Sequence, residues 1–159
     1  YIFTTVSTEA KAELAREAGA DHVILYTQQD FAEEVKNATN GEGVQAVYDS
    51  VAKTTFDQSL NCLKPRGYLV LFGQSSGPVP PIDPQILNTK GSLFLTRPSI
   101  FHYTSTREAL LARAGQVLGW VSKGKLKVRV GERFALSEAA QAHRALEGRQ
   151  TTGKVLLIP

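Results

Sequence analysis

The sequence predicts an α/β protein built on a doubly wound parallel sheet. Short apolar runs alternate with helical segments of about ten residues over most of the chain. The run Tyr68–Gly73 is continuously apolar, which is typical of a strand buried on both faces. Clusters of Gly, Asn, Pro and Ser separate the segments. Because helices lie between successive strands, right-handed βαβ units with parallel pairing are expected.

Strands and helices alternate up to Thr96. The predicted strands are Tyr1–Val6, His22–Tyr26, Val44–Tyr48, Tyr68–Gly73 and Ser92–Thr96, and the predicted helices are Glu9–Ala18, Phe31–Ala38 and Thr54–Leu63. Gly19 ends the first helix, and Asp30 with Glu33 forms a capping box for the second. Pro65 ends the third helix, and Ser75–Pro84 is expected to be a loop.

The regular alternation of short strands and helices changes near the carboxyl end. The predicted elements there are a helix with an apolar stripe that ends at Gly124, a half-exposed strand Lys125–Phe134, a helix Glu138–Glu147 and a strand Lys154–Ile158. Ser105 with Glu108 caps the first of these helices, and Ser137 caps the second. We therefore place a domain boundary after residue 124, giving the domains 1–124 and 125–159.

The composition narrows the class of protein. The net charge of +3 is spread along the chain, which makes nucleic acid a less favoured partner. The single cysteine, Cys62, and the absence of a Cys/His cluster favour a reducing, cytoplasmic setting without a metal site. No run reaches the ~18 apolar residues of a membrane span. The sequence contains no Met, so a trimmed or partial chain is the simpler interpretation.

The first candidate site follows the first predicted strand. In nucleotide-binding sheets of this kind, ligands lie at the carboxyl ends of the strands, where an Asp or Glu binds the ribose of NAD. This chain instead has Ser7, and Lys11 follows in the first helical turn. A hydroxyl, an ammonium group and a helix amino end suit a 2′-phosphate. The alternative is that Ser7 is only an N-cap and Lys11 a solvated surface residue.

Further candidates follow the later strands. The loop Phe72–Gly77 contains small residues that allow close approach of a flat ligand, although an ordinary strand-to-loop turn has the same composition. Arg97 ends the fifth strand and is either a site residue or a surface ion-pair partner. The cations of Lys125–Arg129 share one face of a predicted strand, as a solvated edge or as a phosphate-binding track. No histidine is assigned a catalytic role.

Several stretches resemble one enzyme family. They are YDSV at Tyr48–Val51, LKPRGYLVLFGQSSG at Leu63–Gly77, KGSLFLTRPS at Lys90–Ser99 and the TTGKVLLIP ending. They are similar to the zinc-independent quinone oxidoreductases, the zeta-crystallin-like branch of the medium-chain dehydrogenase/reductase superfamily. The resemblance implies NADPH-dependent reduction of quinones or related conjugated carbonyls, without zinc.

The resemblance also implies roles for individual residues. Those expected around the adenosine 2′-phosphate and adenine are Ser7, Lys11, Tyr26 and Arg149. Those expected around the nicotinamide half are Val51, Phe72, Gly73, Gln74, Ser75, Ser76, Leu95, Thr96 and Arg97. Arg97 would also face the quinone pocket. The strand Ser92–Thr96 would pair antiparallel with its twin in a homodimer.

Members of this family have further segments that precede the part matched here. These are a GroES-like domain and the first strand of the Rossmann-type sheet, with its glycine-rich turn and helix. We therefore expect a parallel Rossmann-type sheet that lacks its central first strand, followed by a C-terminal segment, 125–159, that returns to the absent GroES-like domain. The competing hypothesis is a binding protein: a non-catalytic dinucleotide-binding scaffold, or an RNA-binding or structural crystallin-like protein.

Overall fold

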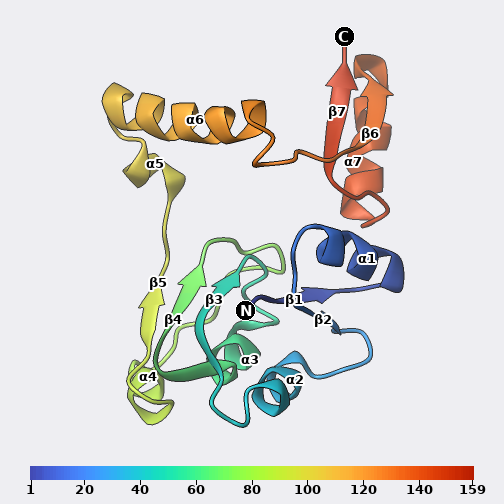
Figure 1. Ribbon diagram of the computed structural model, residues 1–159. Coiled ribbons are helices and arrows are strands. Elements are labelled where there is room, and N and C mark those ends of the chain that lie inside the picture. Colours follow the sequence, from blue (N-terminus) through green and yellow to red (C-terminus); the bar gives the residue numbers. More distant parts are fainter. The chain divides into compact units, whose positions relative to one another are not determined.

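The computed structural model describes residues 1–159 and shows an α/β fold in which every strand pair is parallel (Figure 1). The strands are β1 (Phe3–Val6), β2 (His22–Leu25), β3 (Val44–Asp49), β4 (Leu63–Leu71), β5 (Phe94–Thr96), β6 (Val130–Ala135) and β7 (Lys154–Ile158). The helices are α1 (Glu9–Glu17), α2 (Phe31–Ala38), α3 (Phe56–Asn61), α4 (Gln85–Thr89), α5 (Ile100–Tyr103), α6 (Arg107–Ser122) and α7 (Ala139–Glu147), with a 3-10 turn at Leu136–Glu138. The predicted α/β class with parallel strands is confirmed.

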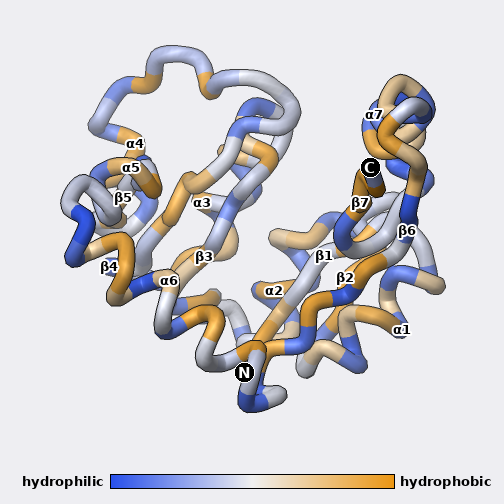
Figure 2. The backbone as a smooth tube through the Cα atoms, turned by 90° about the horizontal axis from the view of Figure 1, so that it is seen from above, coloured by the Kyte–Doolittle hydropathy of each residue, from blue (hydrophilic) through white to orange (hydrophobic).

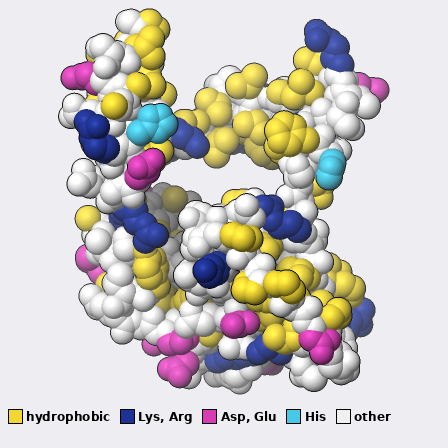
Figure 3. All heavy atoms as spheres, turned by 180° about the vertical axis from the view of Figure 1, so that it is seen from behind, with side chains coloured by type: hydrophobic (Ala, Val, Ile, Leu, Met, Phe, Trp, Pro, Cys, Tyr) yellow, Lys and Arg dark blue, Asp and Glu magenta, His cyan; other side chains and the backbone are white.

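The chain divides into two compact units, Tyr1–Ile100 and Phe101–Pro159. The first contains two sheets, β1-β2 and β3-β4-β5. The second contains α6 and a β6-α7-β7 unit with parallel strands. No residue of α6 is buried, and Figure 3 shows apolar side chains exposed along it. The predicted domain boundary at residue 124 concerns the domains of a longer protein and stays a prediction.

A groove of about 680 Å³ separates the two sheets of the first unit. One wall is the edge of β1, whose only partner is β2, and the other is the edge of β3, whose only partner is β4. Ile24, Val35 and Cys62 also line it. In the tube view the strands on both sides carry apolar residues (Figure 2). The groove lies where the first strand of a doubly wound sheet runs, which agrees with the expectation of a sheet without that strand.

Two apolar clusters hold this unit together. One joins α3 to β4 through Phe56, Leu60 and Leu69, all nearly inaccessible to solvent. The other joins β2 to α2 around Ile24, and Val44 packs against both clusters. Burial of each such large side chain contributes about 1.5–3 kcal/mol. The packing of α2 and α3 therefore holds the two sheets together on one side, although no strand between them pairs with both.

Two helix caps differ from the prediction by one residue. Thr8, not Ser7, caps α1, because its hydroxyl accepts a hydrogen bond from the Lys11 amide at 3.4 Å. Thr106, not Ser105, caps α6 through the Ala109 amide at 3.1 Å. In both places two hydroxyl residues are adjacent in the sequence, and the second of them has the extended backbone of an N-cap. The interpretation of Ser7 as a simple N-cap is therefore wrong.

Other boundaries were also predicted incorrectly. Glu138, not Ser137, is the N-cap of α7, because a 3-10 turn precedes this helix. The strand β4 begins at Leu63, whereas the sequence predicted a helix to that residue. A register shift against β3 and the left-handed backbone of Arg66, at φ 60°, accommodate Pro65 within this strand. The short helices α4 and α5 were not predicted, because four or five residues carry no measurable helical period.

The predicted basic strand face does not form. The strand β6 begins at Val130, so Lys125, Lys127 and Arg129 precede it. The reason is that the partner strand β7 spans only Lys154–Ile158 and pairs with Val130–Ala135. An alternating pattern does not become a strand where no neighbouring strand is available to pair with it.

Candidate functional site

The carboxyl ends of β1 and β2 bring two predicted site residues together. The strands pair in parallel through Val6 and Leu25, and the Tyr26 amide donates to the Val6 carbonyl at 3.1 Å. The Thr27 hydroxyl donates to the Ser7 carbonyl, also at 3.1 Å. Ser7 and Tyr26 therefore lie on adjacent loops that are joined by a hydrogen bond. Thr27 was not among the predicted site residues, and its only signal in the sequence was a hydroxyl residue directly after a predicted strand.

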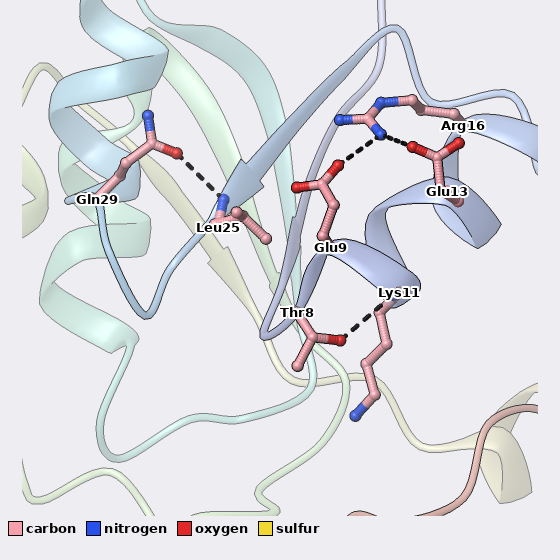
Figure 4. A network of polar contacts seen from close by, with 7 residues as sticks. All are labelled: Thr8, Glu9, Lys11, Glu13, Arg16, Leu25 and Gln29. Carbon is pink, nitrogen blue, oxygen red and sulfur yellow. Dashed lines mark hydrogen bonds and ion pairs between the residues drawn. The ribbon is translucent and has the colours of Figure 1, made fainter.

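Lys11 lies in the first turn of α1, next to these loops (Figure 4). On the same helix, Arg16 forms ion pairs with Glu9, at 2.9 Å, and with Glu13. Figure 4 shows the Lys11 side chain extending away from this acidic pair. Lys11 therefore occupies the first turn of α1, and its contact with a 2′-phosphate stays a prediction.

The loops after β3 and β4 are joined by several hydrogen bonds. The Phe72 amide donates to the Asp49 carbonyl at 2.9 Å, and the Ser75 amide donates to the Ser50 carbonyl at 3.1 Å. The Val51 carbonyl accepts from both the amide and the hydroxyl of Ser76, at 3.0 and 2.7 Å. The structure therefore brings Val51 together with the predicted segment Phe72–Ser76.

Gly73 is required by this close approach. An added Cβ at this position would lie 2.5 Å from the Ser50 carbonyl oxygen and 2.9 Å from its Cα. Contacts that short do not occur with a real side chain. The absence of a side chain at Gly73 therefore lets the two loops approach each other. This steric requirement is a more specific reason for a glycine here than the conformational freedom of a glycine-rich turn.

Asp49 is the buried carboxylate of this region and was not among the predicted site residues. Its side chain accepts hydrogen bonds from the amides of Val51 and Ala52, at 2.7 and 3.0 Å, and from the hydroxyls of Thr55 and Ser59, both at 2.8 Å. Burial by itself raises the pKa of Asp49, but these four hydrogen bonds outweigh it and lower the pKa. Its signal in the sequence was an Asp at the end of a strand, followed by the hydroxyl residues Thr55 and Ser59.

The remaining predicted residues lie at other positions. Thr96 pairs with Val70, so Arg97 follows β5 beside the end of β4, and its guanidinium donates to the Pro98 carbonyl at 3.3 Å. Leu95 packs against the α3-β4 core, so its side chain serves packing. Arg149 belongs to the second unit, just after α7, with a left-handed backbone at φ 56°. Its predicted contact with the same phosphate as Lys11 stays a prediction.

The residues of this chain do not fit a zinc site. No group of three or more His, Cys, Asp or Glu side chains lies close enough to hold a metal ion. Burial raises the pKa of the Cys62 thiol to about 12, which disfavours the thiolate that metals bind. Among the helices, none is long and apolar enough to cross a membrane.

The loops at the carboxyl ends of these parallel strands contain hydroxyl groups, a lysine and a glycine where two loops approach closely. This arrangement has the form of a dinucleotide-binding α/β domain. The sequence profile of the zinc-binding dehydrogenase family matches residues 18–157. The chain therefore belongs to this family, although its own residues provide no zinc site.

Similar proteins support this assignment. The chain is 45% identical to a quinone oxidoreductase of Pseudomonas aeruginosa over 98% of its length, and 45% identical to a 2-haloacrylate reductase of Burkholderia sp over 99%. The structure superposes on the Escherichia coli quinone oxidoreductase complexed with NADPH with a TM-score of 0.94 and 44% identity, covering 99% of this chain and 49% of that chain. The chain spans 48% of each of the two curated relatives, or about half their length.

Proposed function

We propose that this chain forms the NADPH-binding part of an oxidoreductase that reduces quinones or related conjugated carbonyls. The observation that carries the proposal is the pair of loops after β1 and β2, where Ser7 and Tyr26 meet and Lys11 follows in the first turn of α1. This arrangement has a cation and a hydroxyl where an NAD-selective site has a carboxylate. The similarity to quinone oxidoreductases and to a 2-haloacrylate reductase supports the substrate class.

In this proposal each pair of neighbouring loops holds one half of the cofactor. Lys11, Ser7 and the amino end of α1 bind the 2′-phosphate, and Tyr26 lies beside the adenine. The loops of Val51 and Phe72–Ser76 hold the nicotinamide half, and Arg97 orients the acceptor. Bound NADPH supplies the reducing equivalents, so the protein aligns the two reactants and excludes water. This chemistry requires neither zinc nor a protein nucleophile.

Two further features complete the proposal. The strand β5 is the edge of its sheet and exposes Phe94, so we propose a homodimer in which β5 pairs antiparallel with its twin. We also propose a cytoplasmic location, since the only cysteine is a buried thiol. An RNA-binding role receives no support, because the basic strand on which it rested does not form.

The test measures cofactor selectivity in the full-length protein that contains this chain. NADPH should bind more tightly than NADH and should be oxidised when a benzoquinone is added. Lys11→Ala should weaken NADPH binding about 10- to 150-fold, because a charge-assisted hydrogen bond contributes about 1.5–3 kcal/mol. It should leave NADH binding unchanged. Equal affinities for the two cofactors would contradict the proposal, as would salt-dependent RNA retention without reductase activity.

The matched control is Lys64→Ala. Lys64 lies near the amino end of β4, in the other sheet of this unit, whereas the proposed site lies at the carboxyl ends of β1 and β2. Its removal subtracts the same charge, so it should not change the preference for NADPH. A similar loss of NADPH affinity in both variants would show that the effect of Lys11 is general electrostatics rather than contact with the 2′-phosphate.

A further inference from the structure

The Asp49 carboxylate is buried and links two segments of the chain through hydrogen bonds, rather than lying on the surface as a solvated charge. The residue is 5% exposed, and both carboxylate oxygens are fully engaged. One oxygen accepts from the amides of Val51 and Ala52, and the other from the hydroxyls of Thr55 and Ser59. The first oxygen therefore holds the turn that follows β3, and the second anchors that turn to α3.

The turn held by Asp49 has an unusual backbone. Ala52 is completely buried and has a φ of 75°, in the left-handed region that residues other than glycine rarely adopt. Such a conformation persists only where the surrounding structure imposes it. The hydrogen bond from the Ala52 amide to the Asp49 carboxylate, at 3.0 Å, restrains this residue on its amide side, and its carbonyl accepts from the amides of Thr55 and Phe56, both at 2.9 Å.

The same turn sets the position of the next loop. The carbonyls of Ser50 and Val51 accept from the amides of Ser75 and Ser76, at 3.1 and 3.0 Å. The Ser76 hydroxyl also donates to the Val51 carbonyl, at 2.7 Å, and accepts from the Thr54 amide, at 3.1 Å. A displacement of the turn at Val51 therefore displaces the loop Phe72–Ser76 with it.

We propose that Asp49 is a positioning residue that holds the loops after β3 and β4 in place for the nicotinamide half of the cofactor. This inference rests on the proposed function, which assigns those loops to the nicotinamide. Asp49 does not touch the cofactor in this proposal. It acts through the backbone of Val51 and Ala52, and it has no part in the adenosine end, which lies on the loops after β1 and β2.

The experiment compares Asp49→Ala with Asp49→Asn in the full-length protein. Asparagine keeps an oxygen that accepts from the Val51 and Ala52 amides, and its NH2 group faces hydroxyls that can rotate to accept. Asp49→Asn should therefore keep kcat within about threefold, whereas Asp49→Ala should lower kcat about 10- to 100-fold by misplacing one reactant. The control is Ser59→Ala. It removes one donor to the same carboxylate and no bond to the backbone of the turn, while Thr55 still anchors the turn to α3, so its kcat should stay within about threefold.

A second measurement separates positioning from folding. The probe is 2′,5′-ADP, which contains only the adenosine end of the cofactor. Its Kd should be the same in the wild type and in Asp49→Ala, while the fluorescence enhancement of bound NADPH should fall. Loss of 2′,5′-ADP binding in Asp49→Ala, or failure of Asp49→Asn to restore kcat, would overturn the inference. A wild-type protein that binds neither 2′,5′-ADP nor NADPH would instead refute the proposed function.

Discussion

Replacing Gly73 by alanine places a methyl group where the backbone of Ser50 already lies. The added Cβ would stand 2.5 Å from the Ser50 carbonyl oxygen, and ordinary contact begins at 3.4 Å. The two loops must therefore separate by about 0.9 Å to restore normal contact. Ser50 also accepts the hydrogen bond from the Ser75 amide at 3.1 Å, so the separation stretches that bond. The neighbour is backbone, so no side-chain rotation can relieve the contact.

The expected loss of stability follows from the insertion of a methyl group into a well-packed region. Such insertions cost about 1–3 kcal/mol. If this cost falls on local opening of the two loops, it accelerates amide exchange there by about 5- to 150-fold. The amides that should respond are those of Phe72, Ser75 and Ser76, which bond across the two loops.

The assay is hydrogen-deuterium exchange of the full-length protein without cofactor, followed in peptides that cover residues 49–55 and 71–78. The control is Gly115→Ala in α6, where an added Cβ meets nothing within 4 Å. That variant should stabilise its helix by about 0.5–1 kcal/mol and leave the loops unchanged. Unchanged exchange in both loop peptides of Gly73→Ala would refute the reasoning.

Three further predictions concern capping, assembly and the isolated chain. Asp30→Ala should cost about 1 kcal/mol at neutral pH, because Asp30 caps α2. The hydrogen bond from the Glu33 amide lowers the pKa of Asp30. Its contribution to stability is therefore present above the unfolded pKa of about 3.9 and disappears as the pH falls through the lower folded value. Asp30→Asn should keep the cap and remove this acid-side loss in unfolding curves, and an unchanged pH dependence would contradict the assignment. Light scattering of the full-length protein should give twice the chain mass, and a monodisperse monomer would disprove pairing through β5. The isolated 159-residue chain should bind NADPH far more weakly than the full-length protein and should not oxidise it with a quinone, because the groove between β1 and β3 holds no strand whose following turn could bind the pyrophosphate. Equal affinity of the two proteins would refute that argument.

The sequence by itself determined the α/β class, most of the longer elements and the polar groups near their ends. The periods that distinguish a helix such as α2 from a strand such as β3 are local, so they can be recognised without knowledge of the neighbours. The same is true of Ser7 and Phe72–Ser76, which follow predicted strands, and of Lys11, which lies in the first turn of a predicted helix. Parallel pairing followed from the alternation of the elements, because a helix between two strands brings them back in the same direction.

Only the tertiary structure decided which groups meet. Thr27 was recognised only in the structure because its partner, Ser7, lies 20 positions away in the sequence. Asp49 was recognised only there because its four donors, which lie within 10 residues, converge on it through the local fold of the turn and α3. Which of the adjacent residues Ser7 and Thr8 caps α1 depended on where the helix begins, which the local pattern left open by one residue. The failure of residues 125–129 to form a strand depended on the short length of β7. A hydrogen bond or a strand pair is a property of two segments together, and the local pattern of one segment does not contain the position of the other.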